Sequence, residues 1–116
     1  MMIEYHTTGA DEKIAVISAG SVIINEPGDI LDIMAEAGLN GCRKMVVYSE
    51  SLHPDFFDLK TKLAGEILQK FSNYRMRLSI IGDFSDIKSK SLRDFIRESN
   101  RTGIITFVGT ESEALK

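Results

Sequence analysis

The sequence predicts an α/β domain built on a mixed, mostly parallel five-stranded sheet with an N-terminal antiparallel hairpin, in the order ββαβαβαβα. Short runs rich in β-branched residues alternate with segments whose apolar residues recur at helical spacing. The segments between the later strands span about ten residues or more, which suits right-handed crossovers between parallel strands. The 116 residues, 43% hydrophobic and 27% charged, match a single globular domain over residues 1–116.

The first half of the chain predicts a hairpin, a helix and a strand. Residues 1–6 and 13–18 read as strands, and they flank the turn-forming run 8–11, which contains glycine and aspartate. A helix is predicted over 27–39, with Pro27 in its first turn and five apolar residues at helical spacing, namely Ile30, Leu31, Ile33, Met34 and Ala37. The run 45–48 predicts a short strand.

The second half begins with a long predicted helix over 56–74. Its apolar face consists of Phe56, Leu59, Leu63, Ile67, Leu68 and Phe71. Gly65 lies inside this segment, where glycine costs about 1 kcal/mol relative to alanine. We therefore expect Gly65 to permit a close approach by a neighbouring element.

Two further strands and two helices complete the predicted order. The strand 78–81 stops at Gly82, a helix follows over 89–100, and the last strand covers 104–108. Thr110 and Glu113 have the spacing of a capping box, which predicts a short final helix.

Composition indicates the cellular compartment and excludes some classes of partner. The single Cys42 cannot form an intramolecular disulfide, and the N-terminal residues lack a signal-peptide pattern, so we expect a cytoplasmic protein. A net charge of −3 gives no general attraction to nucleic acid or to an anionic membrane. Cys42 follows a predicted helix exit, where no helix dipole stabilises a thiolate, so we expect it to be inert and partly buried.

Polar residues follow the parallel strands, at the edge where open α/β sheets usually bind ligands. A ligand or partner site at this edge would use Glu50, His53, Asp55, Asp58, Thr61, Asp83 and Ser85. The alternative is that these residues only cap helices and form turns, which is common for Ser, Thr and Asp at strand ends. We favour the capping interpretation.

Other kinds of chemistry have little support in the sequence. His53, Asp55 and Asp58 supply metal-ligand types, but a closed site needs about four ligands, so we predict no metal. No glycine-rich phosphate loop and no nucleophile elbow is present, and we predict no cofactor. The catalytic residues, if there are any, stay unassigned.

A basic stripe runs along the predicted helix 89–100. Its members recur at spacings of three and four and are Lys90, Arg93, Arg97 and Arg101. Such a stripe could contact an acidic partner. Asp94 and Glu98 lie three residues before Arg97 and Arg101, so we expect local ion pairs to neutralise much of it.

Several runs carry a family resemblance. The central ones are Pro54–Thr61, Leu63–Phe71 and Asn73–Arg75, and those further along are Gly82–Ser85, Ser89–Ile96 and Glu98–Asn100. Through them essentially the whole chain resembles a bacterial family, domain of unknown function 4180, although Lys62 stands where that family is expected to have glycine. The resemblance implies no established activity, substrate or catalytic residue.

The element order is also similar to that of STAS domains, which are small cytosolic modules that bind partner proteins. This STAS-like similarity is an analogy of topology. In STAS domains a hydroxyl at the start of a helix is switched by phosphorylation, and Thr61 occupies a loosely similar place, with lysine where those domains have glycine.

These observations favour a non-catalytic interaction or regulatory module. The alternative is a small-ligand-binding protein or an enzyme that uses the polar edge described above. We also expect a homodimer, because small domains often cover an exposed strand edge with a second copy. Its interface would be the hairpin region, with Ile3, Tyr5, Val22 and Ile23, or the flank of the long helix with Phe57 and Tyr74.

Overall fold

The structure is a computed structural model that covers residues 1–116. Its five strands form one sheet in the order β1-β2-β3-β4-β5. They are β1 (Met2–Thr7), β2 (Lys13–Ser18), β3 (Lys44–Tyr48), β4 (Arg77–Ile81) and β5 (Ile105–Val108). The pair β1 and β2 is antiparallel, and all the other pairs are parallel. The predicted mixed sheet with its N-terminal hairpin is confirmed.

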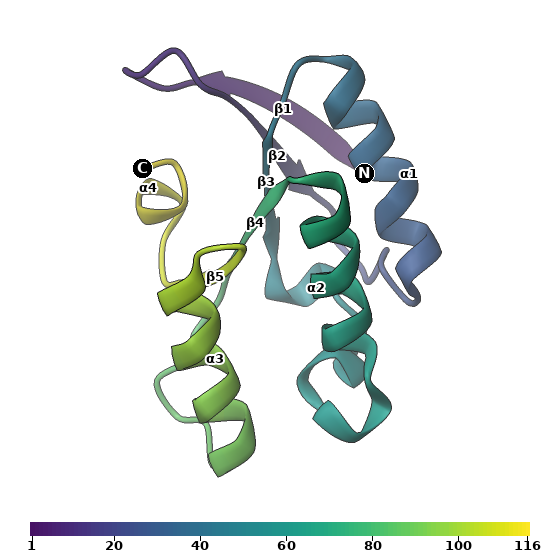
Figure 1. The fold of residues 1–116 in the computed structure, drawn as a ribbon, viewed down its shortest axis with the longest axis vertical. Coiled ribbons are helices and arrows are strands. Elements are labelled where there is room, and N and C mark those ends of the chain that lie inside the picture. Colours follow the sequence, from purple (N-terminus) through teal and green to yellow (C-terminus); the bar gives the residue numbers. More distant parts are fainter.

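Three long helices lie on one face of the sheet (Figure 1). The helices are α1 (Pro27–Leu39), α2 (Leu63–Tyr74), α3 (Lys90–Thr102) and the short α4 (Glu111–Ala114). Each parallel strand is laid down next to the preceding one, and right-handed crossovers then place every connecting helix on the same side. None of the helices has the length and hydrophobicity required to cross a bilayer.

The two faces of the sheet are buried to different extents. The helix-covered face forms a core cluster of 21 buried residues, which includes Ala15, Met45, Leu78 and Phe107. The opposite face forms a cluster of only 5, which α4 covers through Ala114. Most of the hydrophobic stabilisation therefore comes from one face.

The predicted helix 56–74 is wrong at its start. The chain between β3 and α2 forms three short 3-10 helices, η1 (Ser49–Ser51), η2 (Pro54–Phe57) and η3 (Leu59–Thr61), and α2 begins only at Leu63. Lys62 adopts a left-handed conformation with φ 68°, which separates η3 from α2. Successive 3-10 turns repeat every three residues, so Phe56 and Leu59 matched the apolar spacing of a helix without belonging to one.

Some of the predicted interface residues lie in other elements than expected. Val22 and Ile23 lie in the loop after β2, outside the hairpin, because the chain turns there to form a bridge between Ile24 and Leu52. Phe57 belongs to η2 rather than to the long helix, while Tyr74 is the last residue of α2 and is 61% exposed.

A side chain closes the outer edge of β5. The amide of Asn100, in α3, accepts a hydrogen bond from the Phe107 N–H at 2.7 Å and donates one to the Phe107 carbonyl at 3.4 Å. These are the bonds that a further strand would make with β5. The edge at β5 is therefore blocked at its centre.

The expectation of a close approach at Gly65 is wrong. A Cβ at this position would meet no atom within 4 Å, and Gly65 is exposed on α2. Gly65 therefore loses backbone entropy on folding without allowing any closer packing.

We predict that Gly65→Ala stabilises the protein by about 1 kcal/mol, because alanine loses less backbone entropy in a helix. Chemical denaturation followed by circular dichroism measures this change. Gly103→Ala is the control, since Gly103 has φ +84° and its substitution should destabilise the protein. An unchanged or lower stability of Gly65→Ala would contradict the prediction.

Candidate functional site

The polar residues predicted as a site lie in two loops at the carboxyl ends of β3 and β4. Tyr48 and Ile81 end these strands side by side, so the loops start as neighbours. Glu50, His53, Asp55, Asp58 and Thr61 lie in the segment 49–61, whereas Asp83 and Ser85 lie in the loop after β4. Both loops therefore begin at the same edge of the sheet.

Within the segment 49–61 the polar side chains hold the backbone. His53 Nδ1 accepts a hydrogen bond from the Asp55 N–H at 3.0 Å, and Asp58 Oδ1 accepts one from the Lys60 N–H at 3.3 Å. Both contacts cap the start of a 3-10 helix. Glu50 lies exposed in η1.

Thr61 ties the end of this segment together. Its hydroxyl lies 2.6 Å from the Asp55 carbonyl oxygen and 2.8 Å from that of Asp58, and it accepts a hydrogen bond from the Leu63 N–H at 3.3 Å. A hydroxyl has one proton and two acceptor lone pairs, so these three contacts occupy most of its capacity. Thr61 thus organises the entry into α2.

Asp83 and Ser85 form a separate turn. Asp83 Oδ1 accepts hydrogen bonds from the Ser85 hydroxyl at 2.6 Å and from the Ser85 N–H at 3.1 Å. The hydroxyl hydrogen bond, followed by the backbone one, lowers the pKa of the Asp83 carboxyl. Asp83 is exposed, and its carboxylate acts here as a turn former.

The arrangement does not converge on a metal or on an acid/base pair. No three side chains of His, Cys, Asp or Glu lie close enough together to hold a metal ion. His53 lies 3.6 Å from an Asp55 carboxylate oxygen, but the same ring nitrogen already accepts the Asp55 N–H. The geometry therefore supports the capping interpretation for His53, Asp58 and Thr61, whereas Asp55 contributes its backbone N–H and carbonyl.

The ends of β3 and β4 approach each other closely at Gly82. A Cβ on Gly82 would lie 2.7 Å from Ser49 Oγ and 2.9 Å from Phe84 Cζ. Beside this contact is an open hollow of about 240 Å³, lined by Ser49, Phe57, Asp83, Phe84, Ile87 and Leu92. Only two of the lining residues are polar, so the hollow is mainly apolar.

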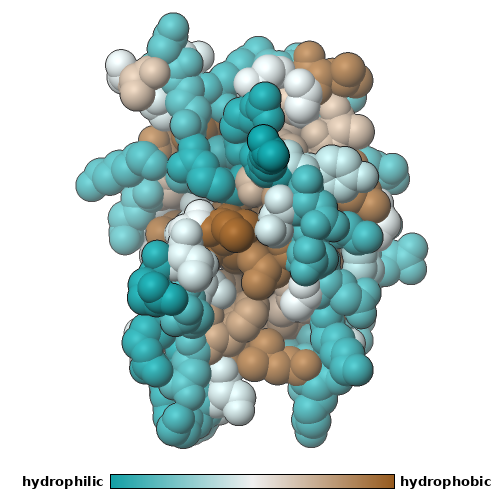
Figure 2. Space-filling view, in the orientation of Figure 1, coloured by the Kyte–Doolittle hydropathy of each residue, from teal (hydrophilic) through white to brown (hydrophobic).

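Aromatic residues form the most distinctive surface of the molecule. Figure 2 shows a strip of hydrophobic surface between α2 and α3, with hydrophilic side chains along both sides. Phe57, Phe84 and Phe95 pack on the core and stay partly exposed. Phe84 links them, because its ring centroid is 6.2 Å from that of Phe57 and 5.2 Å from that of the buried Phe107.

A second hollow, of about 340 Å³, adjoins the first and shares Phe84 and Ile87 with it. Its other lining residues are Arg93, Ile96, Arg97 and Asn100. The floor is apolar, and the charged groups on its rim are two guanidinium groups with no carboxylate among them. We call the joined hollows the Phe84 surface, formed by Phe57, Phe84, Ile87, Arg93, Ile96 and Arg97.

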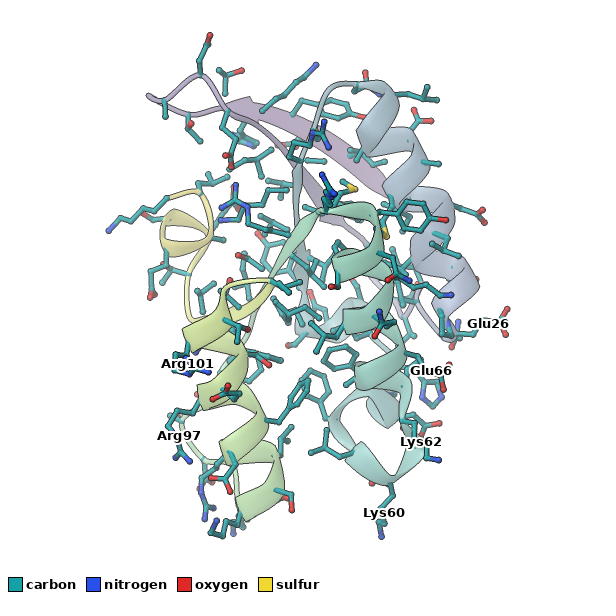
Figure 3. The ribbon with its side chains drawn as sticks, in the orientation of Figure 1. Glu26, Lys60, Lys62, Glu66, Arg97 and Arg101 are labelled. Carbon is teal, nitrogen blue, oxygen red and sulfur yellow. The ribbon has the colours of Figure 1, made fainter.

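The basic stripe on α3 is partly neutralised, as predicted. Asp94 pairs with both Lys90 and Arg97 at 2.7 Å, and Glu98 pairs with Arg101. Arg93 instead donates to the backbone carbonyls of Ile87 and Lys88, which holds the loop before α3 in place. Figure 3 shows Arg97 and Arg101 projecting from α3 on the side away from α2.

Other buried polar groups lie outside these surfaces. Cys42 is buried, and this burial raises the pKa of its thiol, so the expectation of an unreactive cysteine is consistent with its environment. Burial, and next the charge of Arg77, lowers the pKa of the Lys44 ammonium, which donates a hydrogen bond to the Lys116 carbonyl. The buried Ser51 hydroxyl has no hydrogen-bond partner.

We predict that Gly82→Ala destabilises the protein by about 1 to 3 kcal/mol, because the new methyl group would overlap Ser49 and Phe84. Denaturant unfolding measures the loss. Gly20→Ala is the control, since a Cβ at Gly20 would meet nothing within 4 Å. Equal stabilities of the two variants would show that the strand ends are not tightly packed.

We predict that Ser85→Ala raises the pKa of Asp83 towards the ordinary aspartate value, because the hydroxyl hydrogen bond is the largest cause of its depression. The depressed pKa in the folded protein contributes stability above the unfolded pKa of about 4, and this contribution is lost as the pH falls through the folded pKa. The stability difference between wild type and variant should therefore shrink at low pH. A carboxyl-detected NMR titration that gives the same Asp83 pKa in both proteins would refute this.

Comparison with known proteins gives the family and no activity. A family model described as "Domain of unknown function (DUF4180)" matches residues 9–116, which include every helix and all the strands except β1. No curated protein and no solved structure matches the chain. The match over most of the sequence shows that the chain belongs to the DUF4180 family.

Proposed function

We propose that this domain is a non-catalytic interaction or regulatory module of the cytoplasm, and that the Phe84 surface binds a segment of a partner protein. One observation carries the proposal: three phenylalanines stay partly exposed in a connected strip, while the polar residues at the same sheet edge are used in caps and turns. Exposed aromatic side chains beside a polar rim are typical of protein-binding surfaces.

The chemistry of the surface defines the partner segment. Two adjoining apolar hollows meet at Phe84 and Ile87, so two neighbouring apolar side chains of a partner can occupy them. Arg93 and Arg97 border one hollow; Arg97 already pairs with Asp94, but Arg93 has no carboxylate partner and bonds only to backbone carbonyls, which favours an acidic residue next to the apolar anchors. The proposed ligand is therefore an acidic, apolar segment of a protein.

The proposal includes a regulatory role for Thr61. The order of strands and helices is similar to that of STAS domains, in which a hydroxyl at the start of a helix is switched by phosphorylation. Thr61 is exposed at the start of α2, and a phosphate there would replace its hydrogen bonds to the Asp55 and Asp58 carbonyls. In this proposal, modification of Thr61 would loosen the segment that carries Phe57.

The test is selection of binding peptides from a displayed random library on the immobilised domain. We expect enriched peptides that combine aromatic or large aliphatic residues with Asp or Glu. Phe84→Ala and Arg97→Glu should each weaken peptide binding about tenfold or more, because they remove a central anchor and reverse a rim charge. Titration calorimetry with one enriched peptide measures the affinities.

Arg43→Glu is the matched control for Arg97→Glu, because Arg43 is also exposed and lies outside the Phe84 surface. It should bind the peptide like the wild type. Peptides that bind Phe84→Ala unchanged would refute the proposed surface. A nucleotide, metal ion or metabolite that raises the melting temperature of wild type but not of Asp83→Asn would instead support the small-ligand alternative.

A further inference from the structure

The strand β1 forms an open edge of the sheet. It has six residues and pairs only with β2. In the hairpin turn the Thr8 N–H donates to the Glu12 carbonyl at 2.8 Å, so residue 8 points its backbone groups towards β2. Because successive residues of an antiparallel strand alternate in direction, residues 2, 4 and 6 bond to β2, and residues 3, 5 and 7 point outwards.

These outward groups have no partner within the chain. The backbone hydrogen bonds of the loops and turns use neither the N–H nor the carbonyl of Ile3, Tyr5 and Thr7. A row of free donors and acceptors on an exposed strand is a template for pairing with another strand.

The occupant of this edge follows from the state of the opposite one. The Asn100 amide occupies the N–H and the carbonyl of Phe107, so β5 cannot receive β1 of another molecule. Open chains of molecules joined β1 to β5 are thereby blocked. A second copy can use only its own β1, which gives a closed two-fold pair.

We infer that two copies of this chain pair antiparallel through β1, with Tyr5 on the two-fold axis, to form a continuous ten-stranded sheet. Only registers that place outward-pointing residues opposite one another form hydrogen bonds. With Tyr5 at the centre, Ile3 of one copy pairs with Thr7 of the other, and all three outward residues of each strand are used.

The charges on β1 select this register. Centring on Tyr5 sets Glu4 of each copy directly opposite His6 of the other, in a position where cross-strand side chains lie close together. Shifting the centre to Glu4 or to His6 would instead oppose two glutamates or two histidines. The buried His6 Nε2 lacks a hydrogen-bond partner, with the nearest carboxylate oxygen of its own Glu4 3.7 Å away. The His6 side chain is still 35% exposed, so Glu4 of the second copy can approach the accessible part of the imidazole ring.

On the helix-covered face of β1, one contact favours pairing of the two copies and another opposes it. Tyr5 is 37% exposed, and in the pair it packs beside Tyr5 of the second copy. Asp32 and Glu36 of α1 line a hollow with Ile3 at this edge, so the acidic flanks of the two α1 helices come near one another. Added salt should therefore strengthen the pair, because it screens this repulsion.

The test is light scattering during size exclusion at several concentrations, together with sedimentation equilibrium. The wild type should have twice the chain mass of 12.9 kDa at high concentration. Tyr5→Pro removes an outward N–H while leaving the β1 and β2 hydrogen bonds in place, and proline is tolerated on edge strands. It should be a monomer whose circular dichroism matches that of the wild type.

Charge variants test the register. His6→Glu should raise the dissociation constant about tenfold, since two pairs of opposed glutamates replace two Glu4 and His6 pairs. The double variant Glu4→Lys with His6→Glu should restore pairing. Gln69→Glu, which also replaces a neutral side chain by a negative one, on exposed α2, should leave the dissociation constant unchanged.

Three results would overturn the inference. The first is a wild-type monomer at every concentration up to about 1 mM, which corresponds to negligible affinity. The second is a folded Tyr5→Pro variant that still dimerises, because the interface would then lie elsewhere. The third is a double charge variant no tighter than His6→Glu, because the Tyr5-centred register would then be wrong.

Discussion

The arrangement of this domain depends on the handedness of its crossovers. Four parallel strands follow one another across the sheet in chain order, and each right-handed connection places its helix on the same side. One face therefore carries three helices and the larger core. The other face has only α4, and there the sheet is completed by polar interactions, including the Lys44 hydrogen bond and the ion pair between Glu12 and Arg77.

The same constraint explains the aromatic strip. The helix α1 packs against α2, whereas α3 packs mainly on β5, so the space between α2 and α3 must be filled by side chains. Phenylalanines fill it, and Phe107 from the sheet contacts Phe56, Phe84 and Phe95 at centroid distances of 5.2 to 6.3 Å. The phenylalanine rings between α2 and α3 are large, and neither helix covers all of them. Part of their apolar surface therefore stays exposed to solvent.

The sequence predicts the strands and three of the helices well because their signals are local. Pro27 and the Thr110 and Glu113 pair mark helix starts that the structure confirms, and the apolar runs identify every strand. The start of α2 was missed because the 3-10 turns around Phe56 imitate helical periodicity. The helix start is set by Lys62, which has a left-handed backbone conformation. Lysine rarely adopts this conformation, so the residue type does not predict it.

The sequence predicts where the candidate site lies, but it does not predict whether its side chains bind a ligand or the backbone. Parallel strands bring Glu50 and Asp83 to one edge, as topology requires. Whether a carboxylate binds a ligand or a nearby N–H depends on distances of a few tenths of an ångström, as for Asp83 and Ser85. The Phe84 surface is not predictable from the sequence, because a partly exposed phenylalanine has the same sequence spacing as a buried one.

The protection of the β5 edge by Asn100 also matters while the chain is being synthesised. Each strand pairs with the strand before it, so a chain emerging from the ribosome can add strands one at a time. Every partial sheet then ends in an unprotected growing edge. The residue that closes this edge lies in α3, directly before β5 in the chain, so the final strand and its protection arrive together. Nascent chains truncated before β5 would keep β4 open to association, whereas the completed domain would not.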